Sequence, residues 1–321
     1  MNSDVSVVIP TFHSPYLRNA LESVFSQTWQ PLEIVIVDSS PASTLPDIAD
    51  CRDRVKYLFQ SPNGVSAARN FGIENAQGGM IALLDADDIW HERKLEKQVE
   101  LLLINPEIGF SFSAVWNLTD GAAPGMIPTE PFYPDALNKW ISTNKQHEGA
   151  ASGSAYELLL EVNCIATSSL VIRRDAFKTI GNFDESLKNA EDYEFELRLA
   201  ERYPAVFISE PTSRYRVHDT GLSGEWTTRS ELFHRTNLDA LEKHYRLFPT
   251  VAVKRALAQT CSSYALHYLN LGDFRSASRY SRRSLEIYPS MRAFKHLAES
   301  ISPKVYGFLS VIAGKHTGSC N

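Results

Sequence analysis

The chain has 321 residues, of which 43% are hydrophobic and 22% are charged, a composition typical of soluble globular proteins. A formal net charge of −6 at pH 7 provides no broad basic field, which excludes nucleic acid as the expected main partner. The four cysteines are scattered without CxxC spacing, so neither a disulfide framework nor a zinc site is indicated. No apolar run reaches the roughly 20 residues that cross a bilayer, and no signal peptide is recognised. We therefore expect a cytoplasmic protein.

Four short apolar runs in the first hundred residues predict buried β-strands, at residues 5–9, 33–37, 55–59 and 80–84. Apolar residues at helical spacing predict helices at 14–25, 65–76 and 92–104, the first of them capped by Ser14. Strands that alternate with helices predict an α/β fold with a mostly parallel, doubly wound sheet. In such a sheet ligands bind beyond the carboxyl ends of the strands, so the residues that follow each strand are candidates for the site.

Three acids, Asp85, Asp87 and Asp88, follow the fourth predicted strand. Neighbouring carboxylates raise one another's pKa unless a positive charge offsets them. Mg²⁺ or Mn²⁺ does so through oxygen ligands, and Mg²⁺ commonly uses one or two carboxylates plus water and substrate phosphates. Two alternatives stay open. Asp88 can cap the next helix, and a strand followed by DxD resembles the nucleophile motif of haloacid-dehalogenase-like phosphatases, although Ile89 stands where that motif has Thr or Val.

Four segments, in chain order, carry a resemblance to a known family: VSVVIPTFHSPYLRNALESVFSQTWQPLEIVIVDSS, NGVSAARNFGI, GGMIALLDADDIW and NAEDYEFELRLA. Through them, the first 220 residues or so resemble the family 2 inverting glycosyltransferases with the GT-A fold. The resemblance implies transfer of a sugar from a nucleotide diphosphate sugar to an acceptor hydroxyl, with inversion at the anomeric carbon. It also implies a role in the assembly of bacterial cell-surface polysaccharide or glycolipid, with a saccharide or lipid-linked saccharide as acceptor.

The resemblance assigns nucleotide contacts to residues after the first four strands. Asp38 lies where the family has two adjacent acids against the base, but the second is Ser39 here, so we expect uracil while thymine and guanine are less excluded. Arg69 either approaches the nucleotide or forms an ion pair with one of the acids. The nucleotide-binding residues implied by the resemblance are Pro10, Thr11, Asp38, Arg69 and Asp85.

The remaining assignments concern the metal and the chemistry. Asp87 matches the ligand of Mn²⁺ or Mg²⁺, and Asp88 faces the donor sugar or supports its loop. Inverting transfer needs a general base for the acceptor hydroxyl, and Asp192 matches that position, with Glu191 beside it in acceptor binding. Acids are also favourable at a helix N-terminus without any catalytic role. His218 is a candidate for a further metal or phosphate contact.

The predicted catalytic domain spans 1–224, with a nucleotide half over about 1–117 and an acceptor half over about 118–224. Within it, residues 119–155 are rich in Gly, Pro and Ala and predict a mobile loop. Residues 225–321 predict a helical region, in which about 258–291 resembles one tetratricopeptide repeat. Its basic, partly amphipathic end favours peripheral contact with the inner face of the membrane. The oligomeric state is not indicated.

Two other classes of protein fit the sequence less well. A nucleotidyltransferase needs a basic, Gly-rich loop after the first strand, whereas PTFHSPYLRN offers only Arg18 and no glycine. A non-catalytic protein that binds partners through the helical repeat would be favoured by loss of the acids, yet Asp85, Asp87 and Asp192 are all present.

Overall fold

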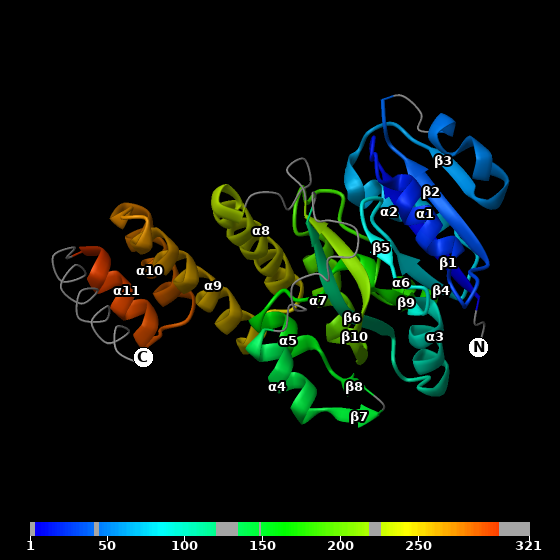
Figure 1. Ribbon diagram of the computed structural model, residues 1–321. Coiled ribbons are helices and arrows are strands. Elements are labelled where there is room, and N and C mark those ends of the chain that lie inside the picture. The colour runs from blue at the N-terminus through cyan, green and yellow to red at the C-terminus, as the bar shows by residue number, and fades with distance from the viewer. Residues whose placement is uncertain (1–3, 42–44, 120–133, 148, 218–225, 302–321) are drawn as a thin grey trace, which may run out of the picture. The chain divides into compact units, whose positions relative to one another are not determined.

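The computed structural model describes residues 4–41, 45–119, 134–147, 149–217 and 226–301 (Figure 1). The chain divides into two compact units, Met1–Trp226 and Thr227–Asn321. The strands, all in the first unit, are β1 (Val5–Thr11), β2 (Glu33–Asp38), β3 (Lys56–Phe59), β4 (Met80–Leu83), β5 (Ile89–Trp90), β6 (Phe110–Thr119), β7 (Lys145–His147), β8 (Ala150–Gly153), β9 (Val171–Arg173) and β10 (Ala205–Val217). The helices of this unit are α1 (Leu17–Phe25), η1 (Leu45–Arg54), α2 (Gly64–Asn75), α3 (Lys94–Ile104), α4 (Asp135–Thr143), α5 (Tyr156–Glu161), η2 (Thr167–Ser169), α6 (Arg174–Ile180) and α7 (Glu191–Arg202).

Among the described residues, these strands form one ten-stranded sheet in the order β3-β2-β1-β4-β9-β6-β10-β8-β7, with β5 paired to β10. The four strands expected in the first hundred residues are β1 to β4, and they are mutually parallel, as Figure 1 shows in blue to cyan. Strand β1 continues through Pro10 to Thr11 instead of stopping at the proline. Pro10 lies beyond the last β1–β4 pair, Val8–Leu83, so its missing N–H breaks no bond to β4.

The second half of the sheet is mixed. Strand β9 is antiparallel to both β4 and β6, β10 is parallel to β6, and β8 is antiparallel to β10. The expectation of a loop over 119–155 was wrong at its described C-terminal end, where α4 is followed by the β7–β8 hairpin. Helix α4 is held by Trp140, which is buried and donates its indole N–H to the carbonyl of Ser154 at 2.7 Å.

The loop that carries the three acids is tied to the start of α1. The expected cap of this helix was wrong: α1 begins at Leu17 after Tyr16, without a side-chain cap. The Ser14 hydroxyl accepts the N–H of Tyr16 at 3.3 Å, just before the helix, and donates to the carbonyl of Ala86 at 3.1 Å. Helix α3 begins at Lys94, also without a side-chain cap, so Asp88 does not cap it. Both polar side chains therefore serve the loop between β4 and β5.

The second unit contains α8 (Trp226–Leu247), α9 (Val251–Asn270), α10 (Phe274–Ile287) and α11 (Met291–Ile301). Helices α9 and α10 pack together, with Tyr280 of α10 stacked on Tyr264 and Tyr268 of α9, and the small residues Ala265 and Ala277 are fully buried. Gly272 adopts a φ of 74° in the turn between them, and the carboxylate of Asp273 accepts a bond from the N–H of Ser276 to cap α10. The stretch 258–291 thus covers a helical hairpin, and its assignment as a tetratricopeptide repeat stays a prediction. No described helix is long and apolar enough to cross a membrane.

We predict that Gly72→Ala destabilises the protein by about 1–3 kcal/mol, because the new Cβ would lie 2.4 Å from Cγ1 of Val8 and force α2 away from the sheet. The loss is expected although alanine has a helix propensity about 1 kcal/mol better than glycine. Urea denaturation of both single variants and of the Val8→Ala/Gly72→Ala double variant measures the coupling. Strictly additive effects would contradict the proposed clash.

Candidate active site

The strand-end acids lie at the carboxyl end of β4, where they face different partners. The carboxylate of Asp85 pairs with the guanidinium of Arg69 at 2.8 Å, and its N–H donates to the hydroxyl of Ser168 at 3.0 Å. The carboxylate of Asp88 is buried and accepts a bond from the N–H of Arg216 at 2.8 Å. The carbonyl of Asp87 accepts a bond from Nε of Arg216 at 2.9 Å. The acid loop is thereby held against β10.

Asp88 is buried within the acid loop, and its Oδ2 atom has no hydrogen-bond partner among the described residues. Burial, and then the charges of Asp87 and Asp85, raise the pKa of its carboxyl well above the usual range. The ionised form of Asp88 is therefore disfavoured beside Asp85 and Asp87, and a cation at this strand end would oppose that rise in pKa.

Arg69 joins the acids of β4 to those of α7. Its side chain is buried on α2, with Nη2 bonded to Asp85 at 2.8 Å and Nη1 bonded to Glu191 at 2.9 Å. Burial alone would lower the pKa of this guanidinium, but the charges of Asp85, Glu191 and Asp192 raise it above its ordinary value. Of the two interpretations that the sequence left open, the ion pair is present, with two acids rather than one.

The acids expected in the acceptor half begin α7. Glu191 is buried, and this burial, followed by the charge of Asp192, raises the pKa of its carboxyl to about 7 in spite of Arg69. Asp192 is half-buried, and its carboxylate accepts bonds from the N–H of Tyr193 at 2.7 Å and from the hydroxyl of Thr167 at 3.4 Å. Arg69 therefore brings Glu191 beside the strand-end acids, with Asp192 next to it in the chain.

The short helix η2 connects both groups of acids, a role that sequence reasoning missed. Thr167 contacts Asp192, while Ser168 contacts Asp85 through its hydroxyl. The carbonyl of Ser168 accepts bonds from the indole of Trp90 at 2.7 Å and from Ser213 at 3.2 Å. The sequence TSS matches no known motif, so the position of η2 beside the acids could be found only from the structure.

A buried amino group lies beneath η2. Lys94 is fully buried, and this burial lowers the pKa of its ammonium group well below the usual value. Its Nζ atom donates to the carbonyl of Ser169 at 3.4 Å and lies 4.4 Å from the ring centroid of Trp90. Gln98 donates to the same carbonyl at 2.8 Å. The backbone of η2 is therefore held by Lys94 and Gln98 of α3 as well as by the contacts of its own hydroxyl groups.

The ends of β1 and β2 lie side by side, with Thr11 paired in register to Asp38. Both residues are buried. The carboxylate of Asp38 accepts bonds from the hydroxyl of Tyr57 and from the N–H of Ser40, and the hydroxyl of Ser39 accepts a bond from the Gln60 amide at 3.0 Å. Tyr57 and Gln60, on and after β3, were not singled out from the sequence, because nothing in the sequence shows that they face Asp38 and Ser39.

Pro10 and His218 are the two remaining candidates from the sequence. Pro10 lies at the carboxyl end of β1, as expected from the sequence. His218 lies outside the described residues. Its neighbour Arg216 is described, and the guanidinium of Arg216 lies over the ring of Tyr16 at 4.1 Å from the centroid.

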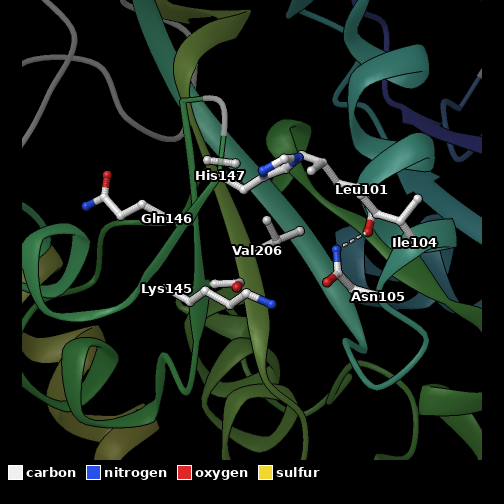
Figure 2. Close-up of a pocket in the computed structure, with 9 residues that line it drawn as sticks. Leu101, Ile104, Asn105, Lys145, Gln146, His147 and Val206 are labelled. Atoms are coloured by element: carbon white, nitrogen blue, oxygen red, sulfur yellow. Dashed lines mark hydrogen bonds between the residues drawn. The ribbon is translucent and has the colours of Figure 1, made fainter.

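A cavity of 230 Å³ lies elsewhere in the first unit (Figure 2). Val206 lines it at the start of β10, whereas Arg216, beside the acids, lies near the end of the same strand, on the order of 30 Å along it. The other side chains that line it come from α3, β7 and β8, and Figure 2 shows Lys145 and His147 at its edge. The cavity is therefore separate from the acid cluster.

The structure supplies a limited set of possible metal ligands. Within the described ranges, no group of three or more His, Cys, Asp or Glu side chains has the arrangement of a metal site. A cation bound at the end of β4 would thus depend on one or two carboxylates and on oxygens from a ligand, the arrangement that Mg²⁺ commonly adopts with phosphates. The hard oxygen atoms of the acid loop fit that requirement.

Comparisons with known proteins place the fold. The chain superposes on TarS of S. aureus with a TM-score of 0.61 at 16% identity, over 90% of this chain and 50% of that chain. It superposes on the mannosyltransferase PcManGT of Pyrobaculum calidifontis, which was solved with GDP-Man and Mn2+, with a TM-score of 0.56 at 17% identity over 94% and 80%. At these identities the likeness concerns the fold alone, and it confirms the expected GT-A fold with a C-terminal helical region.

Sequence comparison gives the family. The description "Glycosyl transferase family 2" matches residues 6–181, and "Glycosyltransferase like family 2" matches 152–276. An uncharacterized glycosyltransferase of Rickettsia typhi is 27% identical over 219 residues, 67% of this chain and 64% of the relative. Another, of Methanocaldococcus jannaschii, is 28% identical over 222 residues, 66% and 70%. The chain belongs to glycosyl transferase family 2, which confirms the expected enzyme class, and it spans 64% of the length of the Rickettsia typhi relative.

We predict that Arg69→Met lowers the free energy of unfolding by about 3–5 kcal/mol, because it leaves Asp85 and Glu191 without their buried counter-charge. The loss should be larger at pH 8 than at pH 5. Without Arg69, the already raised pKa of Glu191 rises further, so the folded variant binds more protons than the unfolded chain and loses stability as pH rises.

Urea denaturation at both pH values measures the effect. Arg93→Met is the matched control, since Arg93 forms an exposed ion pair with Glu96 and its removal should cost less than about 1 kcal/mol. An equal loss for Arg69→Met at both pH values would contradict the electrostatic explanation.

Proposed function

We propose that the protein is an inverting glycosyltransferase that uses Mn²⁺ or Mg²⁺ and moves a sugar from a nucleotide diphosphate sugar, with UDP as the expected nucleotide, to an acceptor hydroxyl. The observation that carries the proposal is the junction at Arg69, which brings Asp85 of the nucleotide half and Glu191 of the acceptor half to one guanidinium. A donor bound at the strand ends would then lie beside the acids of α7.

The nucleotide half supplies the donor contacts in this proposal. Thr11 and Asp38 lie together at the strand ends, with Ser39 and the Gln60 amide next to them. An amide and a hydroxyl offer both a donor and an acceptor, the combination needed by the N3–H and carbonyl oxygens of uracil or thymine. PcManGT was solved with a guanine nucleotide sugar and TarS with UDP-GlcNAc, so the base needs a direct test.

The chemistry is assigned to two carboxylates. Asp87 would hold the divalent cation, which when bound stabilises negative charge on the diphosphate leaving group. Asp192 accepts the proton of the acceptor hydroxyl as that oxygen attacks the anomeric carbon. The bonds from Thr167 and from the N–H of Tyr193 hold this carboxylate in place. Glu191, neutralised by Arg69, lines the acceptor side, and Asp88 supports the loop through Arg216.

The biological setting belongs to the same proposal. We assign the protein to cell-surface polysaccharide or glycolipid assembly at the inner face of the membrane. Helix α11 supports contact with an anionic surface, because Met291 and Phe294 are 86% and 62% exposed and alternate with the exposed cations Arg292 and Lys295. The apolar segment after residue 302 that led to this expectation lies outside the described residues.

We predict that Asp87→Asn abolishes metal-dependent binding of the donor nucleotide, whereas Asp192→Asn leaves that binding unchanged. A thermal-shift series with UDP, dTDP, GDP and CMP, each with and without Mn²⁺, should give a metal-dependent rise in Tm for one diphosphate. Asp87→Asn should abolish this rise and Asp192→Asn should keep it. Sugar transfer should fall by at least about 100-fold in both variants, because one loses the metal contact and the other the base.

Asp175→Asn is the control, since Asp175 is an exposed residue of α6 that forms an exposed ion pair with Lys178. Full transfer activity in either site variant would overturn its assignment. A rise in Tm that survives in Asp87→Asn would place the metal elsewhere.

We predict that Phe294→Ser weakens co-sedimentation with anionic vesicles several-fold and that added salt weakens it further, because an apolar anchor and basic side chains act together. Leu271→Ser is the matched control, as Leu271 is 66% exposed in the turn between α9 and α10. Equal binding by both variants and the wild type would contradict a role for α11.

A further inference from the structure

Helix α7 contains a second buried acid that the proposed mechanism does not use. Glu196 is fully buried, and neither of its carboxyl oxygens has a hydrogen-bond partner among the described residues. Buried polar atoms are nearly always bonded to protein or to ordered water, so an unpaired carboxyl in a protein interior calls for an explanation. The other buried acid of this part of the helix, Glu194, forms an ion pair with Arg198 at 2.8 Å.

The position of Glu196 relates it to the proposed base. It follows Asp192 by four residues, so the two side chains share one face of α7, with their Cβ atoms about 5–6 Å apart. Long side chains in helices lean toward the N-terminus, over the preceding turn. This direction takes the Glu196 carboxyl toward the turn that carries Asp192, whose charge acts on it.

The surroundings of Glu196 favour its neutral form. Burial, and then the charge of Asp192, raise the pKa of its carboxyl well above the usual range, and Glu191 adds to the rise. Within the described part of the chain, the cation that opposes this rise is Arg69, which is already paired with Asp85 and Glu191. The groups that face it are Asp192, Glu191 and Tyr193 on α7, Arg69 on α2 and the Cys164 thiol after α5, whose pKa is raised to about 12 by burial and by Glu196.

We propose that Glu196 is a positioning residue that stays protonated and donates a hydrogen bond, directly or through one buried water, to the carboxylate of Asp192. This inference rests on the proposed role of Asp192 as the base. The donated bond keeps Asp192 ionised and fixes the orientation of its free lone pairs toward the acceptor. The hydroxyl proton passes to Asp192 and then to solvent, while Glu196 retains its own proton throughout.

The test is the pKa of Asp192, measured without any substrate. The ¹³C carboxyl signal of Asp192, assigned by its loss in Asp192→Asn, is titrated in the wild type, Glu196→Gln and Glu196→Leu. Leucine removes the donor and should raise the pKa of Asp192 by about one unit, because a bond to a charged group changes an equilibrium about tenfold or more. Glutamine keeps an uncharged donor and should leave the value within about 0.3 units of the wild type.

Glu194→Gln is the matched control on the same helix. It breaks the buried pair with Arg198, so it should lower Tm without moving the titration of Asp192. An unchanged pKa in Glu196→Leu would overturn the proposal. So would a lower pKa in Glu196→Gln, which would mean that Glu196 is ionised in the wild type and repels Asp192.

Activity separates this proposal from the one on which it rests. Release of the nucleotide diphosphate is followed against pH in the same variants, with Asp192→Asn beside them. The substrate, supplied with Mn²⁺, is a nucleotide sugar that carries the base found in the thermal-shift series and that the wild type turns over. An active Asp192→Asn would reject Asp192 as the base whatever the titration gives. An inactive Asp192→Asn together with an unshifted Asp192 titration in Glu196→Leu would reject the positioning role alone.

Discussion

The buried guanidinium of Arg69 pairs with acids from both halves of the first unit. Arg69 lies between Asp85 and Glu191, with the charge of Asp192 close enough to affect its pKa. Moving an arginine out of water costs several kcal/mol of desolvation free energy, which only close ion pairs and hydrogen bonds offset. Without this residue, acids from two distant parts of the chain would repel one another at one place. The site therefore depends on a charge balance that spans both halves of the sheet.

Two hydroxyl residues of η2, Thr167 and Ser168, also hold the acids in place. The helix η2 follows α5 and precedes β9, the strand that lies between β4 and β6, so the sheet order itself brings η2 to the acid loop. There Thr167 meets Asp192 and Ser168 meets Asp85. The Thr167 hydroxyl donates to the carboxylate of Asp192, whereas the Ser168 hydroxyl accepts the N–H of Asp85, and the buried Lys94 donates to the carbonyl of Ser169 in the same turn. An acidic site of this kind gains order without gaining further charge.

The sequence predicted the parts of the fold that follow from local patterns. The four parallel strands were legible as apolar runs, and the acids at the end of β4 stood out because carboxylates rarely follow a buried strand in such number. The helix α4 and the β7–β8 hairpin were missed, because their signal is short and their stability comes from contacts such as that of Trp140. The partners of Ser14 and Ser168 could not be predicted, since each depends on a tertiary neighbour rather than on spacing.

The distance along the chain between the partners of Arg69 has a consequence for biosynthesis. Arg69 and Asp85 are 16 residues apart, whereas Arg69 and Glu191 are 122 apart. A ribosome that adds about 5–20 residues per second exposes the first pair several seconds before the second carboxylate emerges. During that interval strands β1 to β4 can form with the Arg69–Asp85 ion pair in place, and β4 remains the open edge to which β9 later pairs. The arrival of α7 then completes the charge balance through Glu191, while β10, which follows α7 in the chain, has still to join the sheet.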